Sequence, residues 1–159
     1  MQKSDYAGYE TPKGKNTMKK ALKLVLILMI LGFVAIQFVP VVRSNPPVED
    51  DIKTPKEVDA ILRRSCYDCH SNETHWPWYS HIAPVSWLVA KDVEEGREDL
   101  NFSLWSQGEQ EVDDILHEVK KGKMPMKIYL ITHPSAKMSK EDVAVLEKWI
   151  ADGAPTGVQ

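Results

Sequence analysis

Cysteine is scarce in this chain of 159 residues, which contains only Cys66 and Cys69. A structural zinc site usually combines two pairs of Cys or His ligands, so the lack of a second pair at similar spacing argues against a zinc knuckle. The alternation of apolar and polar residues that marks half-buried strands is also missing, and there is no internal repeat. These absences favour an all-α fold.

An excess of positive charge is absent from most of the chain. Residues 44–159 hold 13 Lys or Arg and 21 Asp or Glu, a net charge of −8 within the −3 of the whole sequence. Nucleic-acid binding requires a basic face that neutralises phosphates, so this region is not expected to have a nucleic-acid partner. The positive charge is concentrated in residues 1–43, which hold seven Lys or Arg and two acidic residues.

A long apolar run follows the N-terminal lysines. It extends from Leu24 to Val42 and is interrupted only by Gly32, Gln37 and Pro40. Nineteen helical residues would reach about 28 Å, close to the hydrocarbon thickness of a bilayer. The sequence therefore predicts a transmembrane anchor with its basic flank in the cytoplasm and the acidic region exported. A cleaved signal peptide is the alternative, but no A-x-A-like cleavage site follows the run.

The two cysteines belong to the stretch Cys66-Tyr67-Asp68-Cys69-His70. The pattern C-x-x-C-H is typical of covalent haem attachment, in which each sulfur forms a thioether with a haem vinyl group and the histidine ligates the iron. The same cysteine spacing occurs in thiol–disulfide redox sites and in metal sites, and these alternatives stay open on the motif alone. A thioredoxin-like site is expected in a βαβ pattern, whereas the flanks of this motif have helical periodicity.

Four helical segments are predicted around this motif. The first begins with Thr54 as N-cap, Pro55 at the first helical position and Glu57 in a capping box, and it leads directly into Cys66. The other three are expected over Pro84–Glu95, Glu109–Lys121 and the residues after a Ser139 cap, ended by Gly96, Gly122 and Gly153 respectively. Asp142, three residues after Ser139, takes the reciprocal position of a capping box, with Asp in place of the usual Glu.

Apolar stripes accompany these segments. Val85, Leu88, Val89 and Val93 are expected to form the buried face of the second helix. Ile61 and Leu62 of the first helix are expected to pack against Leu146 and Ile150 of the last.

A methionine downstream of the motif is a candidate second iron ligand. Met124 follows the predicted helix stop at Gly122 and precedes Pro125, which restricts the backbone of Met124 to an extended conformation. Met126 is a competitor, and Met138 is expected to pack in the core instead.

Aromatic and histidine side chains complete the candidate site. Trp76, Trp78 and Tyr79 follow the motif and are candidates for apolar packing against a flat haem, although ordinary core packing is an equal alternative. Four further histidines are candidate distal groups or replacement ligands, but a structural role is the expectation for each: His75, His81, His117 and His133.

The exported region resembles the bacterial haem-binding domain family, a membrane-anchored group of predicted c-type cytochromes. The resemblance extends over almost all of the region from Thr54 to Gly153 and is carried by these segments: Ser65–Asn72, Trp76–Tyr79, Pro84–Leu88, Glu95–Arg97, Leu100–Ser103, Met124-Pro125 and His133-Pro134. It implies one haem c attached at Cys66 and Cys69, with His70 as an iron ligand and Met124 at the position of the family's Met-Pro motif.

The resulting domain organisation has five parts. We expect a disordered, basic cytoplasmic tail over 1–20, a transmembrane anchor over 21–42, a linker over 43–53, a haem c-binding domain over 54–154 and a short tail over 155–159. The expected location is the bacterial inner membrane, single-pass, with the domain on the extracytoplasmic side.

The expected function is one-electron transfer by a His/Met-ligated haem rather than enzymatic catalysis. The alternatives are a five-coordinate haem sensor or peroxidase-like enzyme and a haem-free thiol oxidoreductase. The expected partners are the membrane, redox proteins in or near it and the cytochrome c maturation machinery.

Overall fold

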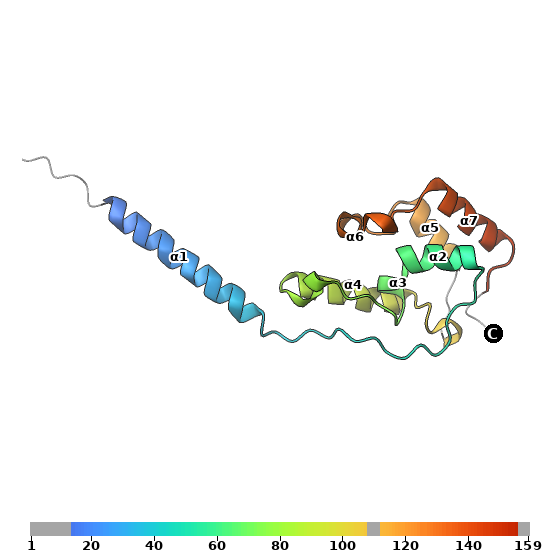
Figure 1. Ribbon diagram of the computed structural model, residues 1–159, viewed down its shortest axis with the longest axis horizontal. Coiled ribbons are helices and arrows are strands. Elements are labelled where there is room, and N and C mark those ends of the chain that lie inside the picture. The colour runs from blue at the N-terminus through green and yellow to red at the C-terminus, as the bar shows by residue number, and fades with distance from the viewer. Residues whose placement is uncertain (1–13, 108–111, 156–159) are drawn as a thin grey trace, which may run out of the picture. The chain divides into compact units, whose positions relative to one another are not determined.

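The computed structural model describes residues 14–107 and 112–155, and in these residues the regular structure is helical (Figure 1). The helices are α1 Gly14–Ile36, α2 Lys56–Ser65, α3 Tyr67–His70, η1 Trp78–His81, α4 Val85–Asp99, η2 Trp105–Gln107, α5 Val112–Lys120, α6 Lys127–Thr132, η3 Pro134–Ala136 and α7 Lys140–Ala151. A single parallel bridge joins Asp50 to Leu104, and the described residues contain no strand. The predicted all-α class is confirmed.

The chain divides into two units, residues 1–40 and residues 41–159. The first unit contains α1, whose large apolar side chains from Leu22 to Val34 are exposed. The predicted transmembrane helix over 21–42 is not found, because α1 ends at Ile36. Its uncharged part, Leu24–Ile36, is about 20 Å long at 1.5 Å per residue. Among the helices described here, none combines the length and the apolar character needed to cross a bilayer.

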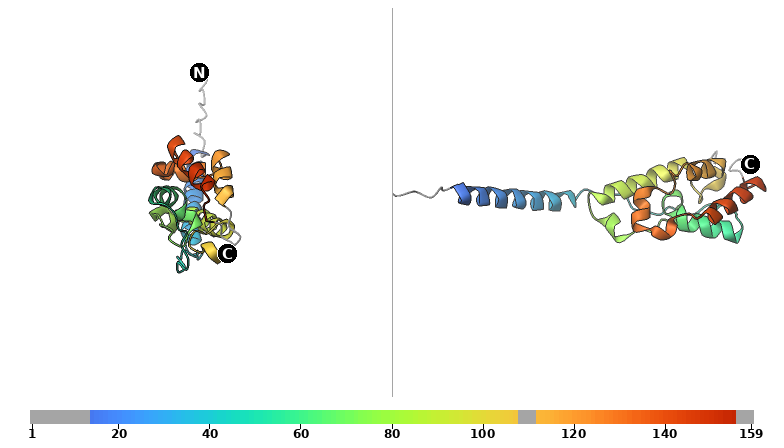
Figure 2. Two further views of the ribbon diagram at one scale, coloured as in Figure 1. Left: turned by 90° about the vertical axis from the view of Figure 1, so that its right-hand side faces the viewer. Right: turned by 90° about the horizontal axis from the view of Figure 1, so that it is seen from above.

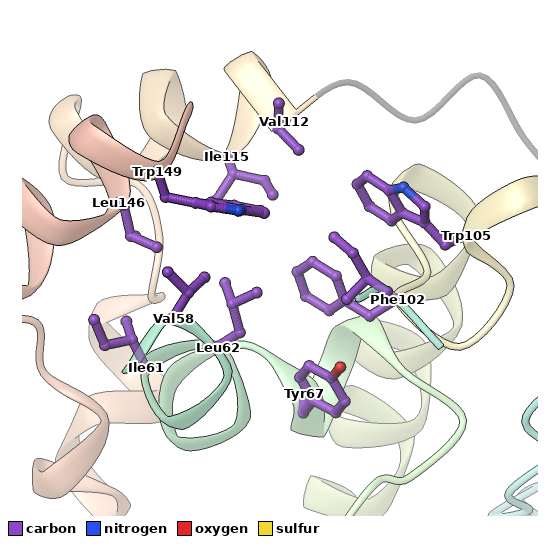
Figure 3. Packing of buried hydrophobic residues seen from close by; sticks show 11 residues of the cluster. Val58, Ile61, Leu62, Tyr67, Phe102, Trp105, Val112, Ile115, Leu146 and Trp149 are labelled. Carbon is purple, nitrogen blue, oxygen red and sulfur yellow. The ribbon is translucent and has the colours of Figure 1, made fainter. Parts of the chain in front are cut away.

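The hydrophobic core of the second unit lies where α2, α5 and α7 meet the segment around Phe102 (Figure 3). Tyr67 and Phe102 stack with ring centroids 5.1 Å apart, and Phe102 stacks on Trp105 at 6.1 Å. Figures 1 and 2 show α2 and α7 side by side, so the predicted pairing of the first and last helices of the domain is confirmed. The buried cluster consists of Ile52, Val58, Ile61, Leu62, Tyr67, Phe102, Trp105, Val112, Ile115, Leu146 and Trp149.

The predicted start of α2 is wrong in its details. The N-cap is Pro55 rather than Thr54, and its side chain cannot accept a hydrogen bond from the first turn. The hydroxyl of Thr54 is buried and has no hydrogen-bond partner among the described residues. The apolar stripe nevertheless fixes the helix, because Val58, Ile61 and Leu62 are all buried.

Helix α4 is longer than predicted. It continues to Asp99, so Gly96 lies inside the helix and does not end it. The predicted buried face is also wrong for Val85 and Leu88, which are 42% and 45% exposed, whereas Val93 is buried as expected. The physical reason is that Val85, Leu88 and Val89 face a cavity rather than the core.

Three predicted helix signals are confirmed: the capping box that begins α7 and the glycines that follow α5 and α7. Ser139 accepts a hydrogen bond from the backbone of Asp142, and the Asp142 carboxylate accepts one from the backbone of Ser139, which forms the predicted capping box of α7. Gly122 follows α5 with φ 66°, and Gly153 follows α7 with φ 92°, a backbone region that favours glycine. The predicted start of α5 at residues 109–111 lies outside the described residues, and α6 was not predicted.

The segment expected to be a spacer is attached to the domain. Arg97 donates hydrogen bonds to the Ser44 carbonyl and to Asn45 Oδ1, and Asn72 donates one to the Pro47 carbonyl. Further along, the backbone of Ile52 donates to the Phe102 carbonyl at 2.9 Å. Residues 44–52 therefore form part of the folded unit, and Ile52 contributes to its core.

Candidate haem site

Two adjoining cavities lie beside α3, the short helix that carries the C-x-x-C-H motif. The smaller, of about 120 Å³, lies between α3, α4 and the Met124–Met126 segment. The larger, of about 350 Å³, is predominantly apolar and lies between α3, η1, α4 and α6. Both cavities are lined by Asp68, Cys69, Asp92, Met126 and Tyr129, so they adjoin at these residues, and together they are called the hollow here.

The backbone of α3 presents both cysteines to this hollow. Cys66 is the C-cap of α2 and the N-cap of α3, and its carbonyl accepts hydrogen bonds from the backbone of Cys69 and His70. One turn of helix therefore separates the two sulfurs. Cys66 and Cys69 both line the smaller cavity, and neither is in a disulfide.

His70 is oriented by two backbone carbonyls. Its Nδ1 lies 2.7 Å from the Gly96 oxygen and 3.2 Å from the Leu100 oxygen. A carbonyl only accepts hydrogen bonds, so Nδ1 must carry a proton, and in the neutral tautomer with this proton the lone pair is on Nε2. Metal-bound histidines are typically held by this arrangement, in which the second ring nitrogen donates to a carbonyl or carboxylate. His70 also lines the smaller cavity, beside both cysteines.

Gly96 makes this arrangement sterically feasible. A Cβ at this position would lie 2.8 Å from the Cys69 carbonyl oxygen and 3.2 Å from Cys69 Cβ. Glycine thus lets α4 approach α3 closely enough for the Gly96 carbonyl to accept from His70. The sequence predicted Gly96 as the end of a helix. The family resemblance includes the segment Glu95–Arg97, but it did not indicate the contact between Gly96 and Cys69.

The environment of the two thiols opposes thiolate formation. Burial raises the pKa of Cys66 to about 12, and the neighbouring Cys69 adds to the shift. Burial likewise raises the pKa of Cys69 to about 12, with further contributions from the charges of Asp68 and Asp92. Cysteines that act in thiol–disulfide exchange usually have lowered pKa values, so this site is poorly suited to that chemistry.

Two methionines face the motif from the other side of the cavity. Met124 and Met126 both line the smaller cavity together with His70, and Met126 also lines the larger one. Met124 is 36% exposed, whereas Met138 packs against the core as predicted. The geometry thus brings both Met124 and Met126 to the site.

The three candidate aromatics occupy different positions. Trp78 and Tyr79 line the larger cavity, and Trp78 is 75% exposed. Trp76 lines neither cavity; its indole N–H donates to Asn45 Oδ1 at 3.2 Å. The structure therefore brings Trp78 and Tyr79 to the larger cavity, whereas Trp76 contacts Asn45 of the N-terminal segment that is attached to the domain.

The remaining histidines also separate into two groups. His75 and His133 line the larger cavity, whereas His81 and His117 line neither cavity. The ring of His133 stacks on Tyr129 at 4.2 Å. Tyr129 is a cavity residue that the sequence reasoning missed, since no motif or periodicity marked the segment that became α6.

A bare metal ion would not be held by this set of side chains. Within the described ranges, no group of three or more His, Cys, Asp or Glu is arranged to bind one. Beside the motif, the smaller cavity is lined by the His70 imidazole, the thioethers of Met124 and Met126, two protonated thiols and four carboxylates, those of Asp68, Asp92, Glu95 and Asp99. The imidazole and the thioethers are side chains with which proteins ligate a haem iron.

Comparison with known proteins gives one match. A family model described as "Haem-binding domain" matches residues 31–152, which is more than half of the chain. No curated protein and no solved structure matches.

Proposed function

Because the chain belongs to the haem-binding domain family, we propose that it binds one haem covalently through Cys66 and Cys69 and transfers single electrons. His70 and Met124 would supply the two axial iron ligands. The haem, when bound, supplies the one-electron chemistry, and the protein supplies ligands and a pocket of low polarity. The observation that carries this proposal is the orientation of His70, whose Nδ1 donates to the Gly96 carbonyl while its ring lines the cavity beside both cysteines.

The residues around the hollow fit this cofactor. Two sulfurs one helical turn apart, both at the cavity wall, match two vinyl groups, and the apolar walls of the larger cavity suit a flat macrocycle. The raised pKa of both thiols disfavours the alternative of a haem-free thiol oxidoreductase. A soft methionine sulfur would favour the ferrous iron and raise the reduction potential.

An iron open on one side is the second candidate, and the 36% exposure of Met124 favours it. Such a protein would act as a sensor or a peroxidase-like enzyme. Carbon monoxide distinguishes the two candidates because it binds ferrous haem only where an axial position is free.

The test uses the full chain, produced in a host with cytochrome c maturation machinery. Haem retained after denaturation would establish the covalent bonds. A far-red sulfur–iron band in the ferric spectrum and no response of the ferrous form to carbon monoxide would support His/Met ligation. Met124→Ala is expected to abolish the band and allow carbon monoxide to bind, whereas Met126→Ala, the matched control, is expected to change neither. Haem lost on denaturation would refute the proposed attachment.

We also propose that the N-terminal unit attaches the protein to a bacterial inner membrane, with the domain on the extracytoplasmic side near its redox partners. The support is the exposed apolar surface of α1, the lysines that precede it and the acidic charge of the domain. Sedimentation of membranes from lysed cells tests this attachment: the protein should sediment with the membranes, and a variant lacking residues 1–40 should not.

A further inference from the structure

Helix α6 forms one wall of the larger cavity but is weakly packed. None of its residues is buried, and Ile128 and Ile131 are 57% and 78% exposed. Among the described elements, only η3 has its backbone close to that of α6. Met126 is the N-cap of α6, so the position of α6 determines where Met126 lies. Met124 precedes it by two residues, and its backbone N–H donates to the Glu118 carbonyl of α5 at 3.3 Å, so Met124 is held between α5 and α6. Apolar packing therefore contributes little to holding the methionine-bearing wall.

A hydrogen bond joins this wall to the motif helix. The Tyr129 hydroxyl donates to Asp68 Oδ2 at 2.7 Å, and Asp68 lies between the two motif cysteines. The other carboxylate oxygen of Asp68 accepts from the backbone of His75 at 3.0 Å, which fixes the acceptor. In the parts of the chain that the structure describes, this hydrogen bond is the side-chain link between α6 and α3. The C-terminal end of α6 is held by a separate hydrogen bond, in which the hydroxyl oxygens of Tyr79 and Thr132 lie 3.0 Å apart.

We propose that Tyr129 is a positioning residue whose hydrogen bond to Asp68 holds the methionine-bearing wall against the haem motif. It thereby keeps the second axial side of the iron closed. This inference rests on the proposed His/Met ligation. A hydroxyl bound to a carboxylate belongs to the stronger class of protein hydrogen bonds, and the weak packing of α6 offers little to replace it.

The test is Tyr129→Phe in the full haem-bound chain, measured by carbon monoxide binding and by the far-red sulfur–iron band. Phenylalanine keeps the ring that stacks on His133 and removes only the hydroxyl. The rate at which the ferrous protein binds carbon monoxide is expected to rise about tenfold or more, because the closed state loses a charge-assisted hydrogen bond. The ferric band is expected to weaken. Asp68→Ala should also raise the rate, although it removes the His75 contact as well. Adding Tyr129→Phe to Asp68→Ala should give no further increase, since the hydrogen bond between the two side chains is already lost.

The matched control is Tyr67→Phe. The Tyr67 hydroxyl donates to Asp51 Oδ1 at 2.9 Å, so the control also deletes a tyrosine–aspartate hydrogen bond on α3, but Tyr67 lies in the core and lines neither cavity. It is expected to lower stability without changing carbon monoxide binding or the far-red band.

The outcomes separate the two hypotheses. If Tyr129→Phe and Tyr67→Phe affect carbon monoxide binding equally, or if Tyr129→Phe matches the parent protein, Tyr129 has no positioning role. If the parent protein itself binds carbon monoxide readily, the His/Met ligation fails, and this inference fails with it.

Discussion

At the scale of single residues, Gly96 determines how closely α4 approaches the motif helix. Replacing it with alanine would place a Cβ 2.8 Å from the Cys69 carbonyl oxygen, a backbone atom that cannot move aside alone. We expect Gly96→Ala to destabilise the haem-bound domain by about 1–3 kcal/mol, as overpacking does in well-packed sites. Thermal unfolding followed by circular dichroism measures this loss.

Gly32→Ala is the control for that substitution. Gly32 is also inside a helix, but no atom lies within 4 Å of a Cβ built there. Alanine has the higher helix propensity, so this variant should be neutral or slightly stabilising. Equal melting temperatures for the two variants would show that α4 can withdraw from Cys69 without cost.

At the scale of elements, the capping box of α7 makes the stability of the domain depend on pH. The backbone N–H of Ser139 lowers the pKa of Asp142, and the Arg64 guanidinium, at 2.8 Å, lowers it further. A carboxyl group whose pKa is lower in the folded state stabilises the fold above its unfolded pKa, near 4. That contribution is lost as the pH falls through the lower, folded pKa.

We therefore expect Asp142→Asn to destabilise the domain by about 1 kcal/mol at pH 7, in the range of helix-capping losses. The difference from the parent protein should shrink as the pH is lowered below about 4. Glu141→Gln, in the same first turn but exposed, is the control and should show no such dependence. Urea unfolding at several pH values measures both, and a difference that is constant with pH would contradict the assignment.

The same elements explain which features the sequence could predict. Most signals that lie within a few residues are confirmed: the apolar stripe of α2, the capping box at Ser139 and the glycine stops at Gly122 and Gly153. The capping box expected at Thr54 is the local exception. Features that depend on distant neighbours were not predicted: Gly96 lies inside a helix, where it closely approaches Cys69, and the apolar face of α4 is turned to a cavity.

The candidate site shows the same division. The motif and the proximity of Met124 followed from local sequence and family resemblance. The carbonyls that orient His70 and the Tyr129–Asp68 hydrogen bond join residues 26 to 61 positions apart, so no local pattern announces them.

At the scale of the whole domain, the core and the cavity lie in different parts of the fold. The core is made by α2, α5, α7 and the Phe102 segment, whereas α6 buries none of its residues and borders the cavity. Elements with few buried contacts open locally at low free energy, and a bound ligand stabilises the elements that contact it. Haem should therefore stabilise α6 far more than α7.

Hydrogen–deuterium exchange on the full chain tests this division, by comparison of the haem-bound protein with a Cys66→Ser/Cys69→Ser variant that cannot form the thioethers. We expect the amides of α6 to lose their protection in the haem-free variant, while those of α2 and α7 keep most of theirs, because Leu62 and Leu146 are fully buried in the core away from the cavity. Loss of protection in all helices together would mean that the core cannot fold without haem. Protection of α6 that is unchanged in the haem-free variant would mean that haem does not order this wall, and Tyr129 would then be holding it unaided.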